Sequence, residues 1–90
     1  MTKEKHQQQS STQKSKEKFY TLMLHNDEIN TFEYVIQTLI EVCDHTELQA
    51  EQCALITHLK GKCDIMTGTL EELLPPKTEI LRRKINVSIV

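Results

Sequence analysis

A short run of polar residues, His25-Asn26-Asp27-Glu28, stands out because acceptor side chains follow one another there. It lies between an alternating apolar run and a predicted helix, and loops between rigid elements are where binding groups concentrate. Asn, Asp and Glu side chains offer mainly acceptor oxygens, which suit a cationic ligand with several N–H donors, such as an ammonium group. An ordinary polar turn that leads into a helix would show the same composition, so both interpretations stay open on composition alone.

His58 stands near the end of a predicted helix, where it could be a surface residue or a hydrogen-bonding group at the mouth of a site. It could also be drawn with Cys43, His45 and Cys63 as a zinc site. The spacings C-x-H and H-x4-C match no closed zinc pattern well, so we expect no metal and no cofactor. The cysteines, which include Cys53, are odd in number and form no CxxC motif. They are more simply explained as reduced thiols that fill a core in a cytoplasmic protein.

A nucleophilic site is a further alternative, since Cys53 or Cys63 could be combined with His58 and Asp27. Such a site needs a three-dimensional arrangement that a sequence cannot supply, and a core of about 70 residues leaves little room for a substrate cleft. The chain has only two glycines, so it has no glycine-rich phosphate loop. We therefore expect a protein that is not an enzyme.

The composition of the chain changes at about residue 18. Residues 1–18 carry five Lys, two Glu and Met1 as the only apolar residue, which gives a net charge of +3. Such a segment buries too little apolar surface to fold, so we predict a disordered N-terminal tail and no signal peptide. Residues 19–90, with a net charge of −5, are predicted to form one core domain. The whole-chain charge of −2 disfavours nucleic-acid binding, and no apolar run is long enough to cross a membrane.

Three segments of the N-terminal half position the polar loop and His58. Residues 19–24 alternate with both sides largely apolar, which indicates a well-covered strand. Asn30-Thr-Phe-Glu33 is typical of an N-cap followed by a capping-box Glu, and it precedes an amphipathic helix of about three turns that reaches Cys43. Thr46-Glu-Leu-Gln49 is a second capping box, which predicts a helix over residues 47–59 that stops at Gly61.

The C-terminal half predicts two more strands and one more helix. Residues 62–66 could form a short strand, with a turn at residues 67–68. Thr69-Leu-Glu-Glu72 is a third capping box, and the helix that it opens is expected to end or break at Pro75-Pro76. Residues 85–90 alternate as a final strand. The order β-α-α-β-α-β predicts the α+β class, as a small sandwich in which a three-stranded antiparallel sheet packs against helices.

Two separated motifs resemble the ClpS family, the bacterial adaptors of the Clp AAA+ protease that read the N-end rule. The first is FYTLMLHNDEINTFEYVIQTLI, and the second is HLKGKCDI. The family's loop-and-helix signature reads Asn26 to Val35 in this chain, and its H-x-x-G-K motif reads His58 to Lys62. The resemblance covers residues 19–66 and, more loosely, the final strand. It implies a ClpS-like core domain over residues 19–90 after the tail.

The resemblance also implies a binding site. In the family, the residues at Asn26, Asp27 and His58 hold the free α-amino group of a substrate's first residue. The first side chain would enter a pocket formed by Glu28, Asn30, Phe32, Val35, Ala54 and Thr57. Phe32 and Ala54 stand where the family usually has Met, whereas Glu28 and Asn30 replace an Asp and a Thr.

The implied function is that of an adaptor. It would bind substrates that begin with Leu, Phe, Tyr or Trp and deliver them to a Clp AAA+ unfoldase, ClpA-like or ClpC-like, for degradation by ClpP. Glu71 is the best candidate for docking on the N-terminal domain of the unfoldase, and the tail takes part in handing over the substrate in this family. The alternative is a non-catalytic interaction module that resembles the C-terminal domain of the ribosomal stalk, which has a similar element order and needs no amine pocket.

Overall fold

A computed structural model describes residues 17–90 of the chain. The predicted disordered tail, residues 1–18, lies outside the described residues except for its last two positions. Six elements follow one another: β1 (Tyr20–His25), α2 (Phe32–Cys43), α3 (Glu47–Lys60), β2 (Lys62–Gly68), α4 (Leu70–Arg82) and β3 (Val87–Ile89). The predicted order β-α-α-β-α-β and the α+β class are therefore confirmed.

The sheet has three strands in the order β2-β1-β3, and both pairings are antiparallel, as predicted. The central strand β1 sets the register: Leu22 lies opposite Met66 on β2 and Ile89 on β3. An irregularity in the pairing with β2 falls between Leu22 and Met23. Because β1 is the middle strand of the sheet, the loop that follows it begins at the centre of one end of the sheet.

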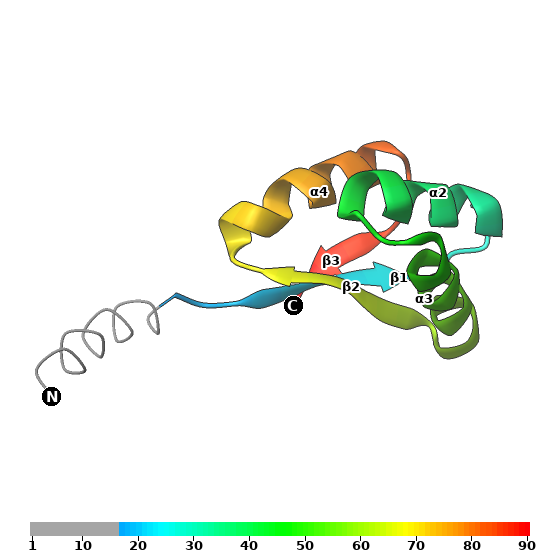
Figure 1. Cartoon of the computed structure of the whole chain (residues 1–90), viewed down its shortest axis with the longest axis horizontal. Helices are drawn as coiled ribbons and strands as arrows, with labels where there is room; N and C mark the ends of the chain where they lie inside the picture. Colours follow the sequence, from blue (N-terminus) through cyan, green and yellow to red (C-terminus); the bar gives the residue numbers. More distant parts are fainter. Residues whose placement is uncertain (1–16) are drawn as a thin grey trace, which may run out of the picture.

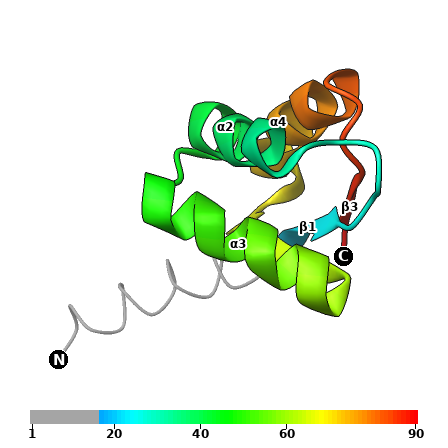
Figure 2. The same ribbon diagram turned by 90° about the vertical axis from the view of Figure 1, so that its right-hand side faces the viewer.

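The helices form a layer over the sheet. Helices α2 and α4 lie side by side over one face, and α3 packs against α2 and β2 (Figures 1 and 2). The core between the layers is aliphatic, and its fully buried members come from all parts of the described chain: Leu22, Leu24, Leu39, Leu73, Ile80 and Ile85. On β1, the side of Thr21 and Met23 is half-buried rather than well covered. The helices therefore cover only one face of the sheet.

Two of the three predicted capping boxes are confirmed. The Thr46 and Gln49 side chains cap α3, and those of Thr69 and Glu72 cap α4. Helix α3 ends at Gly61, which adopts a φ of 95°, a left-handed conformation that glycine tolerates without strain. A glycine there therefore fixes the direction in which the chain leaves α3 toward β2.

The predicted cap of α2 is wrong, because the N-cap is Thr31 and not Asn30. The Thr31 hydroxyl accepts a hydrogen bond from the backbone N–H of Tyr34. Asn30 lies one residue before the cap, where its side-chain amide donates to the Asp27 carboxylate and to the Lys84 carbonyl and its backbone N–H donates to Asp27. Asn30 therefore belongs to the loop, and Glu33 completes no capping box.

The predicted break at Pro75-Pro76 is also wrong, since α4 runs without interruption from Leu70 to Arg82. A proline inside a helix removes a backbone hydrogen bond and costs about 3 kcal/mol. Leu73 precedes the two prolines and Ile80 follows them, and both side chains are fully buried. Their packing into one core holds the two halves of the helix in line.

The strand boundaries also differ from expectation, by one residue at each end of β1, which spans Tyr20–His25, and by more in β2 and β3. Strand β2 continues through Thr67 to Gly68, where a turn was predicted, because both residues pair with β1. The final strand spans Val87–Ile89 rather than residues 85–90, although backbone hydrogen bonds to β1 extend to Asn86 on one side and to Val90 on the other. Ile85 is fully buried but lies before the strand.

Candidate functional site

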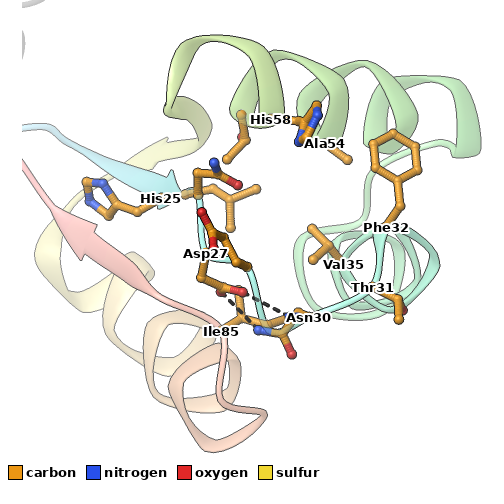
Figure 3. A pocket seen from close by; sticks show the side chains of 13 residues that line it. His25, Asp27, Asn30, Thr31, Phe32, Val35, Ala54, His58 and Ile85 are labelled. Carbon is orange, nitrogen blue, oxygen red and sulfur yellow. Dashed lines mark hydrogen bonds between the residues drawn. The ribbon is translucent and has the colours of Figure 1, made fainter.

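A pocket of about 420 Å³ lies between the loop after β1, the start of α2 and the end of α3 (Figure 3). The nine residues that the sequence predicts for the amine site and the side-chain pocket all line it: Asn26, Asp27, Glu28, Asn30, Phe32, Val35, Ala54, Thr57 and His58. Glu71, the predicted docking residue, lies elsewhere, exposed in the first turn of α4.

Four further residues line the pocket that the sequence did not assign to the amine site or the side-chain pocket, namely Leu24, His25, Thr31 and Ile85. Leu24 ends the predicted strand, His25 begins the polar loop, and Thr31 is the actual helix cap. Their positions in or beside the polar loop could therefore have indicated that they line the site. Ile85 follows α4, far along the chain from the other lining residues. No pattern in the sequence connects it to the site.

The Asp27 carboxylate organises the polar side of the pocket. Its Oδ1 accepts hydrogen bonds from the backbone N–H groups of Ile29 and Asn30, both at 3.0 Å. Its Oδ2 accepts one from the side-chain amide of Asn30 at 2.9 Å (Figure 3). Partial burial acts to raise the pKa of Asp27, but the hydrogen bonds from Asn30 and Ile29 outweigh it and lower that pKa. The carboxylate is therefore a fixed negative charge at neutral pH.

Backbone hydrogen bonds tie this loop to its neighbours. The N–H of His25 donates to the carbonyl of Asn86 at 3.0 Å, and the N–H of Asn26 donates to the carbonyl of Gly61 at 2.9 Å. Within residues 17–90, the exposed side chains of Asn26 and His58 make no hydrogen bond. Both are therefore available to a ligand in the pocket.

Apolar side chains form the other side of the pocket. Figure 3 shows Phe32 and Val35 on α2 across from Ala54 on α3. Ala54 is 5% exposed and belongs to the wall, whereas Phe32 is 43% exposed and stands at the rim. The hydroxyl of the buried Thr57 donates to the carbonyl of Cys53 at 2.8 Å, so this polar side chain is satisfied by its own helix.

The arrangement suits an amphipathic cation, because a fixed carboxylate lies beside an apolar space. It does not assemble the nucleophilic alternative, since Asp27 and His58 share the pocket but neither Cys53 nor Cys63 lines it. Across residues 17–90, no three His, Cys, Asp or Glu side chains come together as a metal site. In the same part of the chain, no helix has the length and apolar character to cross a membrane.

Known proteins share both sequence and fold with this chain. A family model described as "ATP-dependent Clp protease adaptor protein ClpS" matches residues 15–87. The ATP-dependent Clp protease adapter proteins ClpS of Nitratidesulfovibrio vulgaris, strains Miyazaki F and DP4, are each 35% identical over 57 residues, or 61% of this chain. The match covers 57% and 55% of those relatives, so it spans little more than half of their length.

A solved structure has the same fold. Agrobacterium tumefaciens ClpS2, bound to L-phenylalaninamide, matches with a TM-score of 0.77 and 18% sequence identity. The match covers 83% of this chain and 98% of that one. At this level of identity, the likeness shows a common fold.

Proposed function

We propose that this chain, which belongs to the ClpS family of adaptor proteins of the ATP-dependent Clp protease, binds the first residue of substrate proteins in the pocket beside Asp27. One observation carries the proposal: an ionised carboxylate lies in the same pocket as an apolar wall formed by Val35 and Ala54. A protein N-terminus that begins with a large apolar residue has the matching pair of features, an ammonium group and an adjacent apolar side chain.

The polar side would hold the α-ammonium group. Asp27 supplies the counter-charge, and Asn26 and His58 supply hydrogen-bonding groups that no residue within 17–90 occupies. Hydrogen bonds to a charged group contribute about 1.5–3 kcal/mol each. An acetylated N-terminus has lost its charge and a donor, so blocked substrates should be rejected.

The apolar side would hold the first side chain. A Leu or Phe side chain contributes about 1.5–3 kcal/mol on full burial. With the amine contacts, and after the cost of association, we expect a binding free energy of about −8 kcal/mol. This value corresponds to a dissociation constant in the micromolar range or somewhat below it. The L-phenylalaninamide bound by the A. tumefaciens protein carries a free amine and a benzyl group. It supports Leu, Phe, Tyr and Trp as the first residues read by this chain.

The delivery step would involve other parts of the protein. The family is one of adaptors and not of proteases, so this chain would pass its substrate to a Clp unfoldase, ClpA-like or ClpC-like, in the cytoplasm. Glu71, exposed at the start of α4, is the candidate docking residue. Residues 19–90 would form the recognition domain, and residues 1–18 would take part in the transfer of substrate.

Fluorescence anisotropy with labelled peptides tests the proposal. Peptides that begin with Leu, Phe, Tyr or Trp should bind, whereas the same peptide beginning with Ala or acetyl-Leu should bind at least tenfold more weakly. Equal binding of Leu and acetyl-Leu peptides would contradict an amine site and favour a plain interaction module.

A further inference from the structure

The side chain of Asn30 forms a bridge between two distant parts of the chain. Its Nδ2 donates to Oδ2 of Asp27 and to the backbone carbonyl of Lys84, and both distances are 2.9 Å. An amide nitrogen has two N–H donors, so both are in use. The Asn30 amide is thus held between the amine loop and the segment that follows α4.

This bridge limits how Asp27 can bind a ligand. Each carboxylate oxygen has about two acceptor positions. Both positions of Oδ1 are filled by the backbone N–H groups of Ile29 and Asn30, and one position of Oδ2 is filled by the Asn30 side chain. A single position on Oδ2 is left for a ligand, and its direction depends on where Asn30 holds the carboxylate.

The other end of the bridge is held just as firmly. Lys84 has a φ of 69°, an uncommon conformation for a residue with a side chain. The preceding carbonyl, that of Arg83, accepts a hydrogen bond from the Tyr34 hydroxyl at 2.9 Å. The Arg83 side chain in turn binds Glu41 at 2.8 Å. The end of α4 is therefore fixed against α2, and the Lys84 carbonyl is a rigid anchor.

We propose that Asn30 is a positioning residue of the amine site and that the backbone carbonyl of Lys84, outside the pocket, is its anchor. This role rests on the proposed function of the pocket. Asn30 would not contact the α-amine itself. It would aim the one free acceptor position of Asp27 and favour the ionised carboxylate at acid pH, so the end of α4 would take part in substrate recognition.

The first experiment compares Asn30→Leu with Gln52→Leu, using a Leu-starting peptide from pH 3 to pH 8. Gln52 is the control because the same change from an amide to Leu is made there at an exposed position of α3, outside the pocket, and within residues 17–90 its side chain makes no hydrogen bond. We expect Asn30→Leu to bind about tenfold more weakly at pH 7 and to lose binding at a higher pH than the parent on acidification. Gln52→Leu should match the parent in both respects.

The pH profile separates positioning from a purely structural role. The donors of Asn30 lower the pKa of Asp27, so their loss lets Asp27 become protonated at a higher pH. If Asn30→Leu binds within twofold of the parent, or is weaker by the same factor at every pH, the positioning role is wrong.

The second experiment tests the anchor through Lys84→Gly and Lys84→Val. Both variants remove the ammonium group, but glycine accepts a positive φ whereas a β-branched residue resists it. We expect Lys84→Gly to bind as the parent does and Lys84→Val to bind at least fivefold more weakly, with folding checked by thermal denaturation. Equal binding by the two folded variants would overturn the anchor. If Lys84→Val does not fold, the pH profile of Asn30→Leu decides.

Binding by the parent protein shows whether a negative result disproves the proposed function of the pocket or only the role of Asn30. A parent that does not prefer a free amine over acetyl-Leu disproves the proposed function of the pocket. A parent that shows this preference, with Asn30→Leu behaving as the parent does, disproves only the role of Asn30.

Discussion

The backbone N–H of Asn26 donates a 2.9 Å hydrogen bond to the carbonyl oxygen of Gly61. This contact joins the loop that carries Asp27 to the end of the helix that carries His58. Both partners are backbone groups, so the contact does not depend on which side chains occupy the pocket. It brings the two separated sequence motifs into one site.

Removal of the Asp27 side chain should weaken peptide binding. Asp27→Ala leaves the ligand's ammonium group without its counter-ion, and we expect a loss of about 2 kcal/mol or more, or roughly 30-fold in the dissociation constant. Asp27→Asn is the matched variant, because it keeps an oxygen for the loop N–H groups but has no charge. Anisotropy with a Leu-starting peptide is the measurement, and unchanged affinity in Asp27→Ala would show that the amine site is misplaced.

His58→Ala should weaken binding without unfolding the domain. His58 is exposed and makes no hydrogen bond within residues 17–90, so its loss costs the fold little. Lys60→Ala is a suitable control, since Lys60 is also exposed on the last turn of α3 but does not line the pocket. Thermal denaturation should give the same midpoint for both variants and the parent. A His58→Ala variant with the affinity of the parent would remove His58 from the site.

Ala54 should make the pocket less selective for the side chain of the substrate's first residue. Its small side chain leaves room in the pocket wall, so we expect Ile to be tolerated better than with Met at this position, though less well than Leu. Selection by shape alone amounts to about 1–3 kcal/mol. Competition between peptides that differ only at residue one, in the parent and in Ala54→Met, measures the Leu-to-Ile ratio. No change in that ratio would mean that Ala54 does not shape the pocket.

The N-terminal segment should matter for delivery and not for recognition. Deletion of residues 1–18 is expected to leave peptide affinity nearly unchanged, because the pocket's lining residues within the described part of the chain all lie after this segment. Degradation of a Leu-starting substrate by the reconstituted Clp protease should be impaired. Loss of peptide binding on deletion would instead place the segment in the pocket or in the fold.

Glu79 should make the domain more stable at neutral than at acid pH. Hydrogen bonds from Arg82, and then from Arg83, lower the pKa of Glu79 from an ordinary 4.5 to about 2. A carboxylate with a lowered pKa in the folded state stabilises that state above its unfolded pKa, and this contribution is lost as the pH falls from about 4.5 toward 2. Glu79→Gln should therefore lower the melting temperature at pH 7 and have less effect at pH 3.

Glu51→Gln provides the control for Glu79. Glu51 is exposed on α3 and takes part in no ion pair within the described residues. Its replacement should change the melting temperature little at either pH. An equal effect of Glu79→Gln at pH 7 and pH 3 would show that the contacts with the two arginines do not contribute to stability.

Local signals in the sequence were sufficient for the order of the elements and for most of their ends. Thr46 with Gln49 and Thr69 with Glu72 are capping pairs whose partners are three residues apart, so these contacts require no tertiary contact. The alternation before His25 and the helical spacing after Thr31 are equally local. The polar loop and His58 were likewise recognisable as site candidates, because they belong to two contiguous motifs.

Contacts between distant segments decided what these signals did not. Asn30 is a favourable cap by its residue type, but its side chain is held by the carbonyl of Lys84, 54 residues away, as well as by the nearby Asp27 carboxylate, so Thr31 caps the helix instead. Pro75 and Pro76 would end an isolated helix, yet burial of Leu73 and Ile80 on either side of them keeps α4 continuous. Propensities act over a few neighbouring residues, whereas packing and hydrogen bonds across the fold outweigh them and bring Ile85 into the pocket.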